Sequence, residues 1–90
     1  MQLVFDPAKD ALNQSKHSVS LALAEVLFAG PHSVFSDSRF YYGEIRKIAF
    51  GLINARLFVC VYVDRNGVRR IISLRKANSR EVSRHGKALK

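Results

Sequence analysis

The sequence predicts a single α+β domain in which helices flank an antiparallel sheet. Hydrophobic residues recur at helical spacing up to residue 28, the spacing becomes strand-like from residue 33 to residue 76, and a short helical segment follows. Ninety residues allow one modest core and no second domain. The expected order is two helices, a meander of about four antiparallel strands and a last helix, with the helices on one face of the sheet.

The N-terminal residues predict an edge strand and a first helix. Leu3–Phe5 is short and apolar, which suits a strand at the edge of a sheet. Asp6 can then cap the free amides of a helix, and Pro7 is accepted in its first turn. The predicted helix, Ala8 to about Lys16, is polar and has only a thin apolar stripe.

A second helix is predicted at Leu21–Phe28, with Ser18 or Ser20 as its N-cap. Its apolar face is broader than that of the first helix, as expected for the element that packs across the sheet. The dipeptide Gly30-Pro31 ends it, because proline cannot continue a helix and glycine commonly follows a last turn.

The middle of the chain alternates as strands do. Four strands are expected, at Ser33–Ser36, Glu44–Ile53, Leu57–Val63 and Val68–Lys76. The third is apolar on both faces, which is typical of a central strand. Asn54-Ala55 is a tight connection, and Asn66-Gly67 is a strong hairpin signal. The last helix is expected to begin at Asn78 or Ser79.

Charge is the unusual property of this chain. Fifteen Lys and Arg residues oppose seven Asp and Glu residues, which leaves a formal net charge of +8. Such an excess suggests a polyanionic partner, which could be RNA, DNA, an acidic membrane surface or an acidic protein. The sequence has neither a signal-peptide pattern nor a run of ~20 apolar residues that could cross a bilayer. We therefore expect a cytoplasmic protein that does not span a membrane.

Metal and cofactor chemistry have little support. His17, His32 and His85 are isolated and form no metal-binding motif. Neither a glycine-rich phosphate loop nor a serine-nucleophile elbow is visible. The single cysteine, Cys60, lies in an apolar run and is expected to be a buried, unreactive thiol. We predict no metal and no cofactor.

Cations gather on the strand Val68–Lys76 and beside a group of aromatic residues. The clusters are Arg70, Arg75, Lys76 and Arg80; Arg39, Phe40, Tyr41 and Tyr42 just before Glu44 and Arg46; and Lys9, Lys16 and His17 at helical spacing. Cations in an apolar strand are costly to desolvate unless they reach water, an acid or a phosphate. Arginine matches phosphate, and tyrosine stacks on bases. The alternatives are strand ends that simply reach solvent and rings that pack in the core.

These residue types are sufficient for RNA cleavage, because RNA carries its own nucleophile in the 2′-hydroxyl. A ribonuclease must orient that hydroxyl, accept its proton, stabilise the added negative charge and protonate the leaving oxygen. Arg and Lys can stabilise the charge, and Glu, His, Lys or Tyr can share the proton transfers. Two alternatives fit the same composition: a non-catalytic module that masks RNA or an acidic protein, and a structural subunit that docks an acidic partner.

A set of short segments is spread over nearly the whole chain. They are Phe5–Lys9, Asn13, Lys16-His17, Val19-Ser20, Asp37, Arg39, Tyr42–Glu44, Arg46, Gly51, Arg70–Ala77 and Arg80-Glu81. In their order and spacing, and above all in the octet from Arg70, the chain resembles the BrnT family of type II toxin–antitoxin ribonucleases, which have a RelE-like fold. It departs from the family at Ser18, where glycine is usual, at Phe40-Tyr41, where a polar pair is common, and at Arg84-His85, where many relatives carry an aromatic residue.

The resemblance implies a single toxin domain over residues 1–90. It implies a metal-independent endoribonuclease that cleaves RNA and arrests growth by blocking translation. It also implies a neutralising antitoxin of the BrnA type with a ribbon–helix–helix part, and two toxins on an antitoxin dimer. DNA contact would then belong to the antitoxin.

Roles for single residues are hypotheses at this stage. We place Arg70 and Arg75 on the scissile phosphate, and Glu44 as the residue that orients an arginine or accepts the hydroxyl proton. A plain ion pair of Glu44 with Arg46 or Arg70 is the alternative. RNA binding is assigned to Lys76, Arg80, Lys16, His17, Lys9, Arg39, Tyr42 and Arg46. A capping or packing role suits His17 better than a role as an acid.

Overall fold

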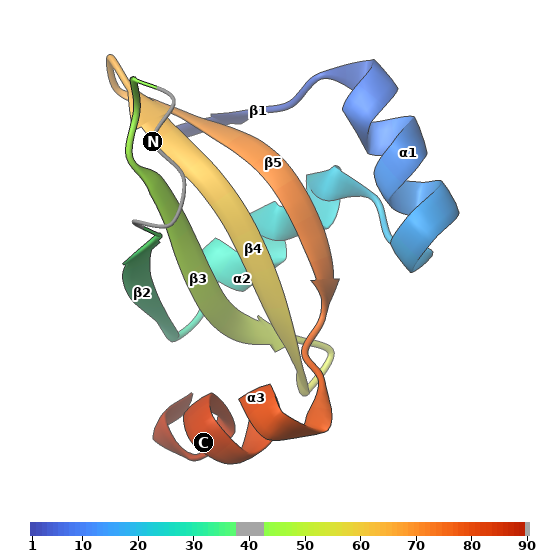
Figure 1. Ribbon diagram of the computed structural model, residues 1–90, viewed down its shortest axis with the longest axis vertical. Coiled ribbons are helices and arrows are strands. Elements are labelled where there is room, and N and C mark those ends of the chain that lie inside the picture. The colour runs from blue at the N-terminus through green and yellow to red at the C-terminus, as the bar shows by residue number, and fades with distance from the viewer. Residues whose placement is uncertain (38–42, 90) are drawn as a thin grey trace.

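A computed structural model, which describes residues 1–37 and 43–89, contains one five-stranded sheet with helices around it (Figure 1). The strands lie in the order β1-β5-β4-β3-β2. The elements are β1 (Gln2–Val4), α1 (Pro7–His17), a 3₁₀ turn η1 (Leu21–Leu23), α2 (Ala24–Ala29), β2 (His32–Asp37), β3 (Arg46–Ile53), β4 (Arg56–Arg65), β5 (Val68–Lys76), α3 (Ser79–His85) and a 3₁₀ turn η2 (Gly86–Leu89). The α+β class and the β5 boundaries agree with the sequence prediction.

The sheet is mixed rather than purely antiparallel. The short opening segment does form an edge strand, but β1 pairs parallel to β5, with Gln2 opposite Val68 and Val4 opposite Arg70. All other neighbours in the sheet are antiparallel. Because most of the chain separates β1 from β5, no tight hairpin turn forces them to run in opposite directions.

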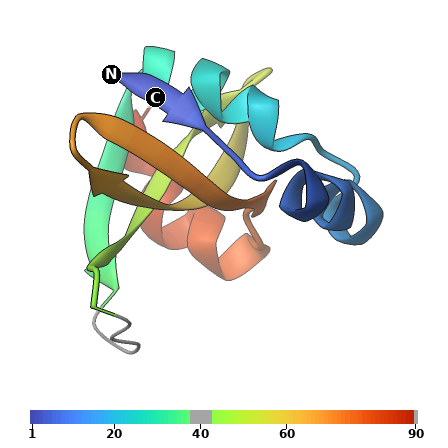
Figure 2. The same cartoon turned by 90° about the horizontal axis from the view of Figure 1, so that it is seen from above.

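Helices lie on both faces of the sheet, so the prediction of a single helical layer is wrong. Figure 2 shows α2 and α3 on opposite sides of the curved sheet. The reason lies in the central strands, where Phe58 and Cys60 point toward α2, whereas Leu57 and Val59 belong to a second apolar cluster on the other face. A strand that is apolar on both faces needs cover on both. The face under η1 and α2 is called the covered face below.

The first helix is fastened to the sheet by one buried amide. Asp6 caps α1 through the Ala8 amide, as the sequence predicts. The side chain of Asn13 donates to the carbonyl of Leu74 (2.8 Å) and accepts from the Leu74 amide (3.1 Å). It also donates to the carbonyl of Val19 (2.9 Å). Asn13 thus hydrogen-bonds to β5 as a neighbouring strand would, beyond the point where the short β1 ends.

The second helix differs from its prediction in its first turn. Ser20 caps it by accepting from the Ala22 amide, but residues 21–23 form a 3₁₀ turn before α2 begins at Ala24. Ser18 is not an N-cap. It ends α1 in the left-handed conformation (φ 59°), which glycine adopts at lower cost, and this explains why glycine suits that position.

Two tight hairpins place β4 at the centre of the sheet. The connection Asn54-Ala55 has two positive φ angles (51° and 63°), and Asn66-Gly67 has the same pattern (53° and 77°). Two consecutive residues with positive φ are what a two-residue type I′ turn requires.

On the covered face the buried Cys60 is surrounded by apolar side chains, and burial raises the pKa of its thiol to about 12. Cys60 is therefore inert, as predicted.

Candidate functional site

The face of the sheet opposite α2 carries most of the strand cations predicted to act on a phosphate. We call it the open face and define it by the side chains of Arg46, Ile48, Val61, Val63, Arg70, Ser73 and Arg75, which lie on one side by strand alternation and register. Only its end near Phe50 is reached by α3. The open face is thus apolar along its middle and cationic at both ends.

A β-bulge at Ile72 decides which arginines share this face. Val61 pairs with Ser73, and the next residue of β4, Tyr62, pairs with Ile71, so Ile72 is an extra residue in β5. Without the bulge, Arg70 and Arg75 would point to opposite faces, because they are an odd number of residues apart. With it, both side chains lie on the open face, opposite Val63 and Val59 respectively.

The two arginines nevertheless occupy different ends of the face. Their partners Val63 and Val59 are four residues apart on β4, which corresponds to roughly 13 Å along a strand. Arg70 lines a groove beside the β4–β5 hairpin, whereas Arg75 lines a hollow under α3. The structure therefore brings the predicted pair to one face but not to one pocket.

At the α3 end, Arg75 is held by a carboxylate. Its two terminal nitrogens donate to Glu81 at 2.8 and 2.9 Å, and Glu81 also accepts from the Asn78 amide at 2.9 Å. Asn78 in turn caps the Glu81 amide, which completes a capping box at the start of α3. The hydrogen bonds from Arg75 hold the pKa of the Glu81 carboxyl below its usual value, and those to Glu81 raise the pKa of Arg75.

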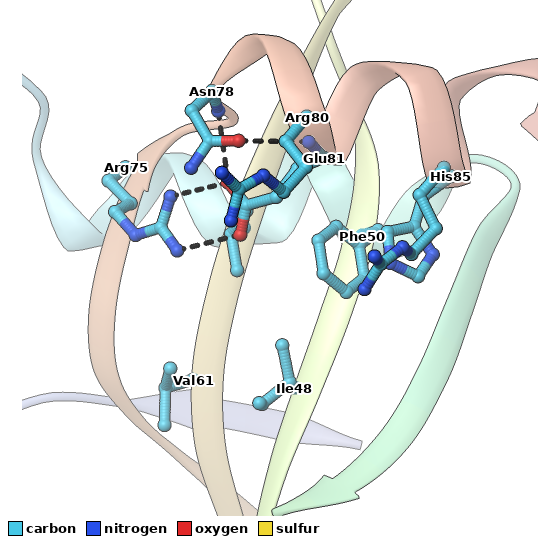
Figure 3. A pocket seen from close by; sticks show the side chains of 10 residues that line it. Ile48, Phe50, Val61, Arg75, Asn78, Arg80, Glu81 and His85 are labelled. Carbon is cyan, nitrogen blue, oxygen red and sulfur yellow. Dashed lines mark hydrogen bonds and ion pairs between the residues drawn. The ribbon is translucent and has the colours of Figure 1, made fainter.

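The hollow under α3 measures about 480 Å³ and is drawn in Figure 3. Ile48 and Val61 of the strands lie at one end of the view, and the Arg75–Glu81 pair faces the rings of Phe50 and His85 across it. Two further arginines, Arg80 and Arg84, line it from α3. The hollow therefore combines an apolar base, an aromatic wall and three guanidinium groups.

At the hairpin end, Glu44 is ion-paired with Arg65, whereas the sequence had left Arg46 and Arg70 open as its ion-pair partners. Both residues line the groove of about 580 Å³ that Arg70 also lines. Arg70 is exposed at this groove. Arg46 lies opposite Asp37 in the β2–β3 register, which places opposite charges across the two strands.

The remaining predicted RNA contacts are scattered. Lys9, Lys16 and His17 line a shallow groove of about 210 Å³ between α1 and the bulge residue Ile72. Lys76 points to the covered face, opposite Phe58, and lines a depression with Arg56 on the far side from Arg75. Lys76 is therefore not on the open face. Arg39 and Tyr42, with the neighbouring Phe40 and Tyr41, lie outside the described residues.

Sequence reasoning did not single out the aromatic wall or the inward role of Arg69. Arg69 faces the covered side, donates to Asp64 at 2.8 and 3.1 Å, and lies over the rings of Phe28 and Tyr62. Its hydrogen bonds lower the pKa of the Asp64 carboxyl. One sequence signal points to His85: it follows Glu81 by four residues, so the two side chains lie on the same side of α3.

Within residues 1–37 and 43–89, no three His, Cys, Asp or Glu side chains are grouped closely enough to hold a metal ion. None of the helices in that part of the chain is long and apolar enough to cross a membrane.

Comparison with protein families identifies the chain. A family model described as the ribonuclease toxin BrnT of type II toxin–antitoxin systems matches residues 5–81, which is most of the sequence. The chain belongs to this family, whose members are ribonuclease toxins that act on RNA and are paired with an antitoxin. A search of curated proteins found no match.

Proposed function

We propose that this BrnT-family chain is a metal-independent endoribonuclease that binds RNA along the open face and cleaves it with the substrate's own 2′-hydroxyl. The observation that carries the proposal is that an exposed cation, Arg70, and a carboxylate, Glu44, line the same groove. Arg70, Glu44 and Arg65 line the hairpin-end groove together. Cleavage by this route needs a cation for the added phosphate charge and a base within reach.

The roles follow from this placement. Arg70 would contact the scissile phosphate and stabilise the charge of the transition state. Glu44 would accept the hydroxyl proton or hold Arg65 in place for the same phosphate, and the 5′-oxygen that leaves as the cyclic phosphate forms would take its proton from water. Arg75, roughly 13 Å away along the sheet, would bind a phosphate further along the strand, together with Arg80. The groove at Lys9, Lys16 and His17 would hold the strand where it leaves the open face.

The biological setting is part of the same proposal. The chain would act in the cytoplasm and inhibit translation by destroying RNA. Its antitoxin would be of the BrnA type, with a ribbon–helix–helix part that contacts DNA, and two toxins would bind one antitoxin dimer. Support comes from the family membership and from the net charge of +8, which favours an acidic or nucleic-acid partner.

The direct experiment uses the purified, antitoxin-free chain with a long unstructured RNA in excess EDTA. The proposal expects cut RNA whose new 3′ ends are 2′,3′-cyclic phosphates, and no cutting of the same RNA made with 2′-O-methyl groups. Cleavage that requires added metal, or that also cuts the methylated RNA, would refute the proposed chemistry.

A non-catalytic RNA-binding module is the second candidate. One observation favours it: Arg75 and Glu44 are both engaged in ion pairs within the protein, with Glu81 and Arg65 respectively. Such a module would retard RNA in a gel in a salt-sensitive manner and leave it intact. Intact RNA in the EDTA experiment, together with retardation, would decide for this candidate.

A further inference from the structure

Three aromatic rings meet where α3 crosses the open face. The imidazole of His85 stacks on Phe50, with ring centroids 3.9 Å apart and planes inclined by 15°. Phe35 of β2 packs its ring edgewise against both, at 5.1 Å from His85 and 5.9 Å from Phe50. Phe50 is only 6% exposed, whereas Phe35 is 47% exposed. Phe50 is therefore the buried inner ring of the cluster, and the rings of Phe35 and His85 reach the surface.

His85 is placed for more than covering Phe50. Its ring is half-buried and lines the hollow under α3, together with Arg80 and Arg84 of the same helix. A residue that served only to shield Phe50 would gain more from an apolar side chain. A flat ring beside several guanidinium groups instead suits a ligand that has both a π-face and a negative charge.

A nucleotide is such a ligand. Its base can stack on an aromatic side chain and its phosphate can bind arginine, which is the combination that single-stranded RNA readers use. An acidic peptide would satisfy the arginines but would gain nothing from the stacked rings. The volume of about 480 Å³ also lies within the range of small-ligand pockets.

We propose that the hollow under α3 is a base-binding subsite, in which one nucleobase of the RNA stacks on His85 and the adjoining phosphate binds Arg84 and Arg80. This inference rests on the proposed function and adds a second point of RNA recognition, at the end of the open face away from Arg70. His85 is a positioning residue, because it lies at the opposite end from the proposed scissile phosphate.

The polar groups of the hollow also limit what the subsite can read. Both carboxylate oxygens of Glu81 already accept hydrogen bonds from Arg75, and one accepts from the Asn78 amide as well. Few acceptors remain for the edge of a base, so recognition depends on stacking. Stacking tolerates every base, with an advantage for the larger purines. The subsite therefore favours purines modestly rather than specifying one base.

The test uses a short 2′-O-methyl RNA, which cannot be cut by its own 2′-hydroxyl, with the fluorescent base 2-aminopurine at one position in turn. Stacking quenches its fluorescence. With the parent chain, one position should be quenched on binding. His85→Phe should keep the quench, whereas His85→Leu, which keeps the packing on Phe50 but has no ring, should lose it and weaken binding roughly 5- to 100-fold.

Controls separate this inference from the proposed function. Arg84→Ala should weaken binding, and Arg56→Ala, an exposed arginine on the covered side, should leave it unchanged. Thermal unfolding of each variant establishes that it is folded. Equal binding and quenching by folded His85→Leu, or no quenched position with the parent, would overturn the subsite even if the parent cuts ordinary RNA. Quenching without cleavage of ordinary RNA would support the subsite and refute the proposed ribonuclease activity.

Discussion

Arg69 and Arg70 are adjacent in sequence but have opposite tasks, because successive residues of a strand point to opposite faces. Arg69 is paired with Asp64 and lies over two rings on the covered face, with only 19% of its side chain exposed. Arg70 is exposed on the open face. One neighbour therefore contributes to stability, and the other is available to a ligand.

This contrast gives a prediction with a built-in control. Arg69→Ala should lower the free energy of unfolding by about 2–3 kcal/mol, because it removes two charged hydrogen bonds and the cation–π contacts and leaves Asp64 with only the longer contact to Lys47, at 3.8 Å. Arg70→Ala should change it by no more than about 0.5 kcal/mol. Urea denaturation measures both. Equal losses for the two variants would contradict the assignment of the two faces.

Acid should weaken the fold through two carboxylates. The pKa values of Asp64 and Glu81 are both lowered in the folded chain, chiefly by hydrogen bonds from Arg69 and Arg75. The unfolded chain therefore binds more protons in acid than the folded chain does. The stabilisation from these two ion pairs is complete above the ordinary pKa values of 3.8 and 4.5, and it is lost as pH falls through the lower pKa values of the folded chain.

The measurement is the urea midpoint of the parent and of Asp64→Asn from neutral pH down to the acid range. The parent should be steady at neutral pH and should lose stability below about pH 4.5. Asp64→Asn should start lower and decline less steeply over the acid range. An identical acid slope in the two proteins would show that the Asp64–Arg69 pair makes no such contribution.

At the scale of elements, α1 depends on Asn13 for its attachment to the sheet. The side chain makes three buried hydrogen bonds to the backbone of Leu74 and Val19. Asn13→Ala should cost about 2–4 kcal/mol, because it leaves buried backbone groups unpaired. Hydrogen exchange should also speed up at the Leu74 amide. Unchanged exchange there would mean that another group or a water molecule accepts the hydrogen bond from the Leu74 amide.

The elements themselves could largely be predicted from the sequence. Val68–Lys76 was predicted with the boundaries that the structure has, because an Asn-Gly turn precedes it and Asn78 caps the helix after it. The parallel pairing of β1 could not, since local pattern carries no information about the direction of a distant partner. The apolar pattern of β4 already implied that a helix covers the second face, as α3 does. The order of the elements had instead predicted that all helices lie on one face of the sheet.

The candidate site was less accessible to sequence reasoning. The bulge at Ile72 determines which face each arginine occupies, and nothing in the run Ile71-Ile72-Ser73 marks it. The ion-pair partners could not be predicted either. Glu44 meets Arg65, and Arg75 meets Glu81, only because the fold brings them together. Residue types could be predicted for the site, whereas their division between two ends of one face needed the structure.

For the whole molecule, the net charge of +8 should govern the approach of RNA. The logarithm of the affinity for 2′-O-methyl RNA should fall linearly with the logarithm of the salt concentration. Arg84→Ala should reduce that slope by about 0.7, the contribution of one phosphate contact to a single strand, whereas Arg56→Ala should not. If both variants reduced the slope equally, RNA would be attracted by the total charge rather than by the open face.

In the proposed mechanism, the open face of the sheet carries the cleavage chemistry. The most direct measurement is the rate of RNA cleavage in EDTA by the parent, by the Arg70→Ala, Arg75→Ala double variant and by Arg56→Ala as a charge control. We expect the folded double variant to be slower by at least about 10²-fold, as for loss of a charge-stabilising donor, and Arg56→Ala to cut at the parental rate. Cleavage at the parental rate by the folded double variant would contradict the placement of the chemistry on the open face.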